Sequence, residues 1–155
     1  MQKITSFTVD HDYIVPGMYI SRIDGDVTTF DLRTRRPNAG DYMSNLTMHS
    51  VEHMLATLLR NGPYADSVIY FGPMGCQTGF YLLTRALAPE VVYDEVLRVL
   101  RETLAYAGKM PGESAKECGN YRNLSMDAAK AECERYLAAL LARGADFTYP
   151  KGDAL

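Results

Sequence analysis

The chain has 155 residues, of which 47% are apolar and 23% carry a charge. These values are typical of a globular protein, and the length predicts a single domain over 1–155 with a proper hydrophobic core. The formal net charge is −3 and no basic run is present, which argues against a nucleic-acid partner. No stretch approaches the about 18 consecutive apolar residues of a membrane span, so we also expect no membrane partner.

The cysteines and the first residues indicate a compartment. The first ten residues lack the apolar core of a secretion signal, and the three cysteines form no Cys-x-x-Cys pair. Free thiols without a secretion signal are typical of a reducing environment. We therefore expect a cytoplasmic protein with reduced cysteines.

The first third of the chain predicts strands followed by a helix. β-Branched and aromatic residues predict strands at 4–9, 18–23 and 27–34, and the last two are joined by a turn around Gly25. Apolar residues at helical spacing predict a helix at 46–60. An Asn-Gly-Pro sequence follows directly and is a strong signal for the end of that helix.

The rest of the chain predicts two strands and two helices. The strands, at 68–71 and 79–85, enclose a glycine-rich corner. A helix at 89–107 has proline at its first position, and a last helix at 125–143 stops at a glycine. The segment between these helices is predicted to be irregular, and the tail 145–155 to be loosely held.

The order of these elements predicts the fold class. Strands joined by short turns favour antiparallel pairing, and no strand-helix-strand crossover is predicted. We therefore expect an α+β fold in which an antiparallel sheet packs against segregated helices.

The most informative motif is His-Ser-Val-Glu-His at 49–53. On a helix, His49 and His53 lie one turn apart, so both imidazoles can reach one metal ion. Glu52 has the position of a general acid or base in a metal-dependent enzyme. The apolar stripe of this helix points roughly away from the histidines, so they do not belong to its main packing face. Two solvated surface histidines would give the same pattern.

Each cysteine has a different context. Cys118 lies beside a glycine in the irregular segment, where it is either a third metal ligand or a buried free thiol. Cys76 lies in the glycine-rich corner, where it either fills the turn or acts as an acid, base or nucleophile. Such a reactive role requires a nearby cation or metal that favours the thiolate. Cys133 falls on the apolar stripe of the last helix, and we expect it in the core.

Five motifs in the chain, taken together and in order, are highly specific. They are Ser-Phe-Thr-Val-Asp-His at 6–11, Phe-Asp-Leu-Arg at 30–33 with Pro-Asn at 37–38, His-Ser-Val-Glu-His at 49–53, Pro-Met-Gly-Cys-Gln-Thr-Gly-Phe-Tyr at 73–81, and Glu-Cys-Gly-Asn-Tyr at 117–121. In these motifs the chain resembles the S-ribosylhomocysteine lyase (LuxS) family, which makes the precursor of the autoinducer-2 signal. The resemblance covers most of the chain.

The resemblance implies a homodimer with two equivalent sites at the subunit interface. It also implies one divalent metal per chain, usually iron(II), which zinc or cobalt can replace. The positions that match the family's metal ligands are His49, His53 and Cys118. Those that match its two acid/base groups are Glu52 and Cys76. Those that match its substrate-binding residues are Ser6, His11 and Arg33. The nearby Arg35 and Arg36 leave open which arginine faces the pocket.

The implied reaction converts S-ribosylhomocysteine into homocysteine and 4,5-dihydroxy-2,3-pentanedione. Elimination of the sulfur needs an acidic proton beside the carbon that carries it, so the sugar carbonyl must first migrate along the chain through enediolates. A Lewis-acidic metal stabilises these enediolates, while Cys76 and Glu52 move protons. The products would serve quorum sensing or only the recycling of homocysteine in the methyl cycle, and the sequence leaves this choice open.

Two other interpretations compete with the lyase. His-x-x-Glu-His is also the inverted zincin motif of metallopeptidases, although a cysteine ligand and a second reactive thiol argue against that class. A non-catalytic, metal-stabilised binding module would need a fourth protein ligand, for which Cys76 is the candidate. One departure from the family pattern is Leu124, which stands where a histidine is expected and predicts a lost hydrogen bond near the site.

Overall fold

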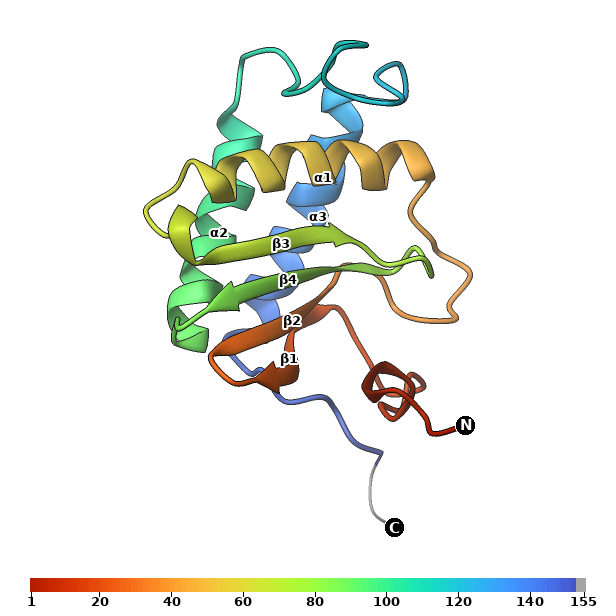
Figure 1. Ribbon diagram of the computed structural model, residues 1–155. Coiled ribbons are helices and arrows are strands. Elements are labelled where there is room, and N and C mark those ends of the chain that lie inside the picture. The colour runs from red at the N-terminus through yellow and green to blue at the C-terminus, as the bar shows by residue number, and fades with distance from the viewer. Residues whose placement is uncertain (153–155) are drawn as a thin grey trace.

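A four-stranded antiparallel sheet forms one layer of the molecule, and three α-helices cover one of its faces (Figure 1). The computed structural model describes residues 1–152. The strands are β1 (Gly17–Asp24), β2 (Val27–Arg33), β3 (Val68–Pro73) and β4 (Gly79–Arg85), in the sheet order β1-β2-β4-β3. The helices are α1 (Asn45–Arg60), α2 (Pro89–Ala105) and α3 (Met126–Arg143). The predicted α+β fold, with an antiparallel sheet packed against helices, is confirmed. The prediction of no strand-helix-strand crossover is wrong, because α1 joins β2 to β3, and these two strands run parallel on either side of β4.

The alternation of side chains in β2 explains which face of the sheet is covered. Phe30 and Leu32 are fully buried in the core shared with the helices, where Leu32 pairs with Phe80 of β4. Successive side chains of a strand point to opposite faces, so Asp31 points to the other side of the sheet. Asp31 is nevertheless only 1% exposed. A buried carboxylate on the uncovered face indicates that other segments shield it there.

Helix α1 has the boundaries and the buried face that its sequence predicts. The side chain of Ser44 accepts a hydrogen bond from the backbone nitrogen of Thr47 and so caps the first turn. The helix ends at Arg60, directly before the Asn-Gly-Pro sequence. Its buried apolar residues are Met48, Val51, Met54, Leu55 and Leu59. Both histidines of the helix are only partly buried and lie off this stripe.

The predicted strand at 4–9 is wrong. The structure has only a short 3-10 turn at Thr5–Phe7, closed by local hydrogen bonds such as that from Phe7 to Ile4. The outer edge of β1 is already occupied, because the backbone nitrogen of Ile20 donates to the carbonyl of Phe147 at 2.9 Å. A segment with strand propensity forms a strand only where it pairs with a strand edge, and at the edge of β1 the C-terminal tail takes that place. A second 3-10 turn, Ala65–Ser67, precedes β3.

The prediction of a loosely held tail is also wrong for its described part. Besides the bond from Ile20, the carbonyl of Thr148 accepts a hydrogen bond from the Arg143 side chain at 3.1 Å. The ring of Tyr149 stacks on that of Tyr19 with a centroid separation of 4.7 Å. Positions 153–155 lie outside the described residues. None of the helices within 1–152 is both long and apolar enough to cross a membrane.

Candidate metal centre and active site

The three predicted metal ligands come together in the structure. His49 and His53 project from the same side of α1, and Cys118 approaches them from the loop between α2 and α3. One ligand atom from each residue can be chosen so that all lie within 4.8 Å of one another. The Cys118 sulfur lies 3.4 Å from Nε2 of His49, and the two imidazole rings meet edge to face.

Both histidine rings are oriented by backbone carbonyls. Nδ1 of His49 lies 2.8 Å from the carbonyl oxygen of Asn123, and Nδ1 of His53 lies 2.7 Å from that of Pro111. A carbonyl oxygen only accepts hydrogen bonds, so each Nδ1 carries the proton and each Nε2 has a free lone pair. No pattern in the sequence predicts these partners, because every residue type has a backbone carbonyl. It also follows that Leu124 does not deprive His49 of a partner, since the neighbouring backbone supplies one.

The donor set fits a divalent transition metal. Two imidazole nitrogens and one thiolate suit zinc or iron, and a site with three protein ligands leaves a position open for substrate. The backbone nitrogen of Asn120 donates to the Cys118 sulfur at 3.4 Å. Cys76 does not belong to this cluster. The closed four-ligand site of a purely structural metal is therefore not supported, and the thiol ligand also differs from the carboxylate usual in inverted zincins.

Glu52 lies beside the cluster in a hollow of about 220 Å³. The hollow is lined by Asn45, Met48, His49, Glu52, Pro73, Asn120 and Asn123. Because Glu52 is adjacent to His53 on α1 and only partly buried, its carboxylate is available to a molecule bound in this hollow. Glu52, a predicted acid/base residue, and His49, a predicted metal ligand, thus line the same hollow.

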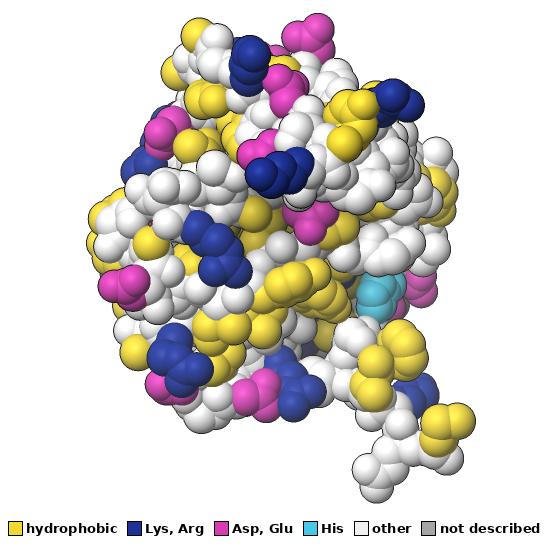
Figure 2. All heavy atoms as spheres, turned by 45° about the horizontal axis from the view of Figure 1, so that its top comes forward, with side chains coloured by type: hydrophobic (Ala, Val, Ile, Leu, Met, Phe, Trp, Pro, Cys, Tyr) yellow, Lys and Arg dark blue, Asp and Glu magenta, His cyan; other side chains and the backbone are white. Residues whose placement is uncertain are grey.

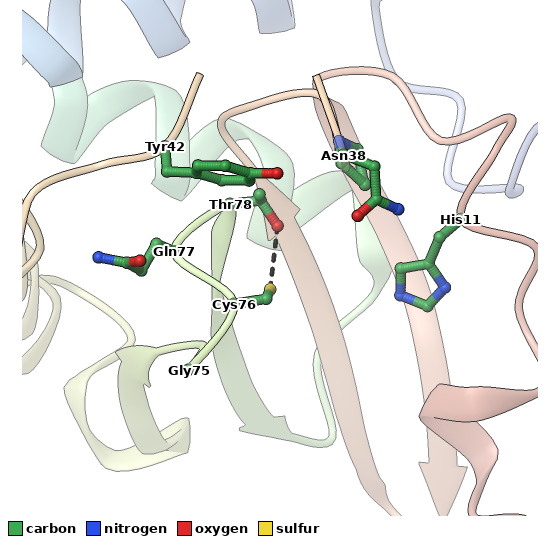
Figure 3. A pocket seen from close by; sticks show the side chains of 8 residues that line it. His11, Asn38, Tyr42, Gly75, Cys76, Gln77 and Thr78 are labelled. Carbon is green, nitrogen blue, oxygen red and sulfur yellow. Dashed lines mark hydrogen bonds between the residues drawn. The ribbon is translucent and has the colours of Figure 1, made fainter. Parts of the chain in front are cut away.

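Cys76 lies in a second hollow, of about 280 Å³, at the tight turn between β3 and β4 (Figure 3). Its lining residues are His11, Pro37, Asn38, Tyr42, Gly75, Cys76, Gln77 and Thr78. Figure 3 shows His11 and Cys76 on opposite sides of this space. The turn is tied to the segment before α1, because the backbone nitrogen of Met43 donates to the carbonyl of Gln77 at 3.0 Å. Figure 1 shows this turn and the first turns of α1 at the same end of the molecule.

Arg33 places a positive charge beneath Cys76. Its side chain is 3% exposed, and its guanidinium makes a two-pronged pair with Asp31, with distances of 3.1 Å (Nε to Oδ1) and 2.6 Å (Nη2 to Oδ2). The remaining nitrogen, Nη1, donates to Thr78 Oγ1 at 2.8 Å and to the Cys76 sulfur at 3.9 Å. Burial lowers the pKa of Arg33, but hydrogen bonds and charge from Asp31 outweigh it and raise that pKa above its ordinary value. The cation beside Cys76 is therefore permanent.

The other two arginines of this region point elsewhere. Arg35 makes a two-pronged pair with Glu132 of α3 and a further pair with Asp41, so it anchors the loop before α1. Arg36 is exposed. Of the three, Arg33 is the one that contacts the Cys76 thiol, although it is not one of the residues that line the hollow.

Ser6 lies in neither of these hollows. It lines a third one on the uncovered face of the sheet, together with residues that include Thr29, Tyr70 and Tyr81. Within one chain, Ser6, the pair of His11 and Cys76, and the pair of His49 and Glu52 thus line three different hollows.

Known proteins resemble this chain over nearly its whole length. The model of the S-ribosylhomocysteinase (LuxS) family matches residues 4–146. The chain belongs to the S-ribosylhomocysteinase (LuxS) family. Among the relatives is the S-ribosylhomocysteine lyase of Clostridium beijerinckii, with 44% identity over 91% of this chain and 92% of the relative. The enzymes of Desulfotalea psychrophila and Borreliella burgdorferi are 45% and 42% identical, over 91% and 90% of this chain and 92% and 93% of their own.

Membership in the LuxS family makes the chain a carbon–sulfur lyase. The predicted resemblance is confirmed, and the metallopeptidase interpretation is not supported. The histidine–cysteine cluster of this LuxS chain can hold a metal ion.

Proposed function

We propose that the chain cleaves S-ribosylhomocysteine to homocysteine and 4,5-dihydroxy-2,3-pentanedione, the precursor of autoinducer-2. The observation that carries this proposal is the cluster of His49, His53 and Cys118 in a chain of the LuxS family. Its two imidazoles are already turned so that Nε2 can bind a metal.

We propose one divalent ion per chain, held by these three residues. Iron(II) is the proposed ion, and zinc or cobalt would replace it, since all three accept mixed nitrogen and sulfur ligands. When bound, the ion would act as a Lewis acid towards the oxygens of the sugar, which favours migration of its carbonyl.

Two side chains are proposed to move protons. Cys76 is suited to accept a proton from a sugar carbon, because Nη1 of Arg33 lies 3.9 Å from its sulfur and stabilises a negative charge there. Glu52 would transfer protons from the side of the metal cluster. Elimination then expels the homocysteine sulfur, which takes up a proton. Cys76 and Cys118 must both be reduced for this chemistry, which is consistent with a cytoplasmic enzyme.

We further propose that the site is completed by a second copy of the chain in a two-fold homodimer. Within one chain, Ser6 and His11 line other hollows than the one beside the metal cluster, and a site shared between subunits would bring such residues together. The N-terminal segment exposes the large apolar side chains of Ile4 and Phe7, and the uncovered sheet face exposes the ring of Tyr70. Figure 2 shows hydrophobic side chains in a hollowed band across the molecule and again on the protruding segment at lower right. Such surfaces are typical of subunit interfaces.

The activity is tested with purified protein loaded with iron(II) or cobalt(II) under anaerobic conditions. S-Ribosylhomocysteine is added, and free thiol is measured with a chromogenic disulfide. The dicarbonyl product is trapped with an aromatic diamine and identified by mass spectrometry. We expect equal amounts of both products and none from protein stripped of metal. Absence of both products with every metal would contradict the proposal.

A further inference from the structure

The described end of the C-terminal tail reaches the uncovered face of the sheet, next to the charged pair beneath Cys76. After α3 the tail runs along the edge of β1, where Phe147 accepts a hydrogen bond from Ile20. The ring of Tyr149 then stacks on Tyr19 with an angle of 17° between the planes. These contacts place the Tyr149 hydroxyl over the sheet.

The hydroxyl of Tyr149 donates to Oδ2 of Asp31 at 2.7 Å. Burial, and then the charge and hydrogen bond of Asp31, raise the pKa of Tyr149 far above its ordinary value. The phenol therefore stays protonated and remains a donor at every pH at which an enzyme works. Its partner, Asp31, is buried, and a hydrogen bond to a buried carboxylate is more stabilising than the same bond exposed to water.

The same oxygen of Asp31 also accepts from Arg33. Oδ2 accepts one hydrogen bond from Nη2 of Arg33 at 2.6 Å and another from the Tyr149 hydroxyl at 2.7 Å. Nη1 of the same guanidinium reaches Thr78 and Cys76 on its other side. A continuous chain of contacts thus runs from Tyr149 through Asp31 and Arg33 to the sulfur of Cys76.

We propose that Tyr149 is a positioning residue for the lyase reaction. Its hydroxyl shares the charge of Asp31, so the guanidinium of Arg33 can also face the Cys76 thiolate. Without this donor, Arg33 alone would satisfy Oδ2, and the guanidinium would be drawn towards the carboxylate and away from the sulfur. The inference rests on the proposed function, because that function assigns proton transfer to Cys76.

The test compares Tyr149→Phe with wild type and with Tyr93→Phe, all as full-length, metal-loaded protein. Phenylalanine keeps the ring that stacks on Tyr19 and removes only the hydroxyl. Tyr93 is the matched control, because its buried hydroxyl donates to the carbonyl of Leu140 at 3.0 Å and has no charged partner. Iodoacetamide is applied at one fixed pH, and labelling of Cys76 is followed by peptide mass spectrometry. The alkylation rate reports how much thiolate is available.

We expect Tyr149→Phe to slow Cys76 alkylation about three- to tenfold, the effect of one lost hydrogen bond, and Tyr93→Phe to leave it unchanged. In the lyase assay, kcat should fall by a similar factor while KM stays within about twofold, since the substrate contacts are intact.

An alkylation rate of Cys76 in Tyr149→Phe equal to that of wild type would overturn the proposal. An equal decrease of the Cys76 alkylation rate in Tyr93→Phe would also overturn it, because the decrease would then result from a general loss of packing in the protein. Failure of the proposed function would appear as wild-type protein without lyase activity, and the alkylation comparison does not depend on that activity.

Discussion

Nδ1 of His53 lies 2.7 Å from the carbonyl oxygen of Pro111, and the next residue, Gly112, lies against the same ring. A Cβ atom at position 112 would be 3.0 Å from both Cε1 and Nδ1 of His53. Gly112 also has a φ of +73°, a left-handed conformation that other residues rarely adopt. The loop can therefore approach the ring of His53, a proposed metal ligand, only because it has no side chain here.

Gly112→Ala should weaken metal binding about tenfold, since it displaces a histidine whose orientation depends on this loop. Metal affinity is measured by competition with a chromophoric chelator. The matched control is Gly25→Ala, which has a similar backbone strain at φ +62° but no atom within 4 Å of the new Cβ. A similar loss of affinity in both variants would mean that strain, and not contact with His53, is responsible.

Cys118→Ala should lose most of its bound metal, because only two imidazole ligands remain. Metal content per chain is measured by elemental analysis after gel filtration. Cys133→Ala serves as the control, since that thiol is 1% exposed in the core and should not affect metal content. Full metal content in Cys118→Ala would remove this residue from the site.

Glu52→Gln and Cys76→Ala should keep the metal and the fold but lose lyase activity by on the order of a thousandfold, as expected when a positioned proton-transfer group is deleted. Thiol release and metal content are measured on the same samples. Glu134→Gln changes an exposed glutamate of α3 and should remain active. Near wild-type turnover in either site variant would show that its side chain does not transfer protons.

The proposed dimer predicts partial recovery of activity when two inactive variants are mixed. If His11 and Glu52 reach one pocket from opposite subunits, a mixed dimer of His11→Ala and Glu52→Gln has one intact site and one doubly damaged site. Activity should return as subunits exchange, and light scattering should give the mass of two chains. A monomeric mass would refute the dimer. Inactive mixed dimers would refute the division of the site between subunits.

Cys133 predicts a specific dependence of stability on pH. Burial, and then the charge of Glu132, raise the pKa of its thiol from 9.0 to about 12. The folded state thus keeps a proton that the unfolded chain releases above pH 9.0, so this contribution to stability is complete below that pH and is lost as the pH approaches about 12. The difference in free energy of unfolding between wild type and Cys133→Ala should shift against wild type between about pH 8 and about pH 11, measured with urea. A difference that stays constant over this range would contradict the raised pKa.

Local features of the fold follow from the sequence by itself. The boundaries and buried face of α1 result from apolar periodicity, a serine cap and an Asn-Gly-Pro stop, all of which act over a few residues. The spacing of His49 and His53 is likewise local, because a helix always brings such positions to one side. The five motifs in order also sufficed to predict the family.

Contacts between distant segments were decided only by the tertiary structure. Whether Cys118 meets His49, across 69 positions of sequence, depends on how α1 and the loop after α2 pack. The first segment has the composition of a strand, yet the tail that follows α3 already occupies the edge of β1. The choice of Arg33 over Arg35 depends on strand register and on Glu132 of α3, which holds Arg35 away. In each case the arrangement is stabilised by a contact with a residue far along the chain. No local sequence pattern specifies which distant residue makes that contact.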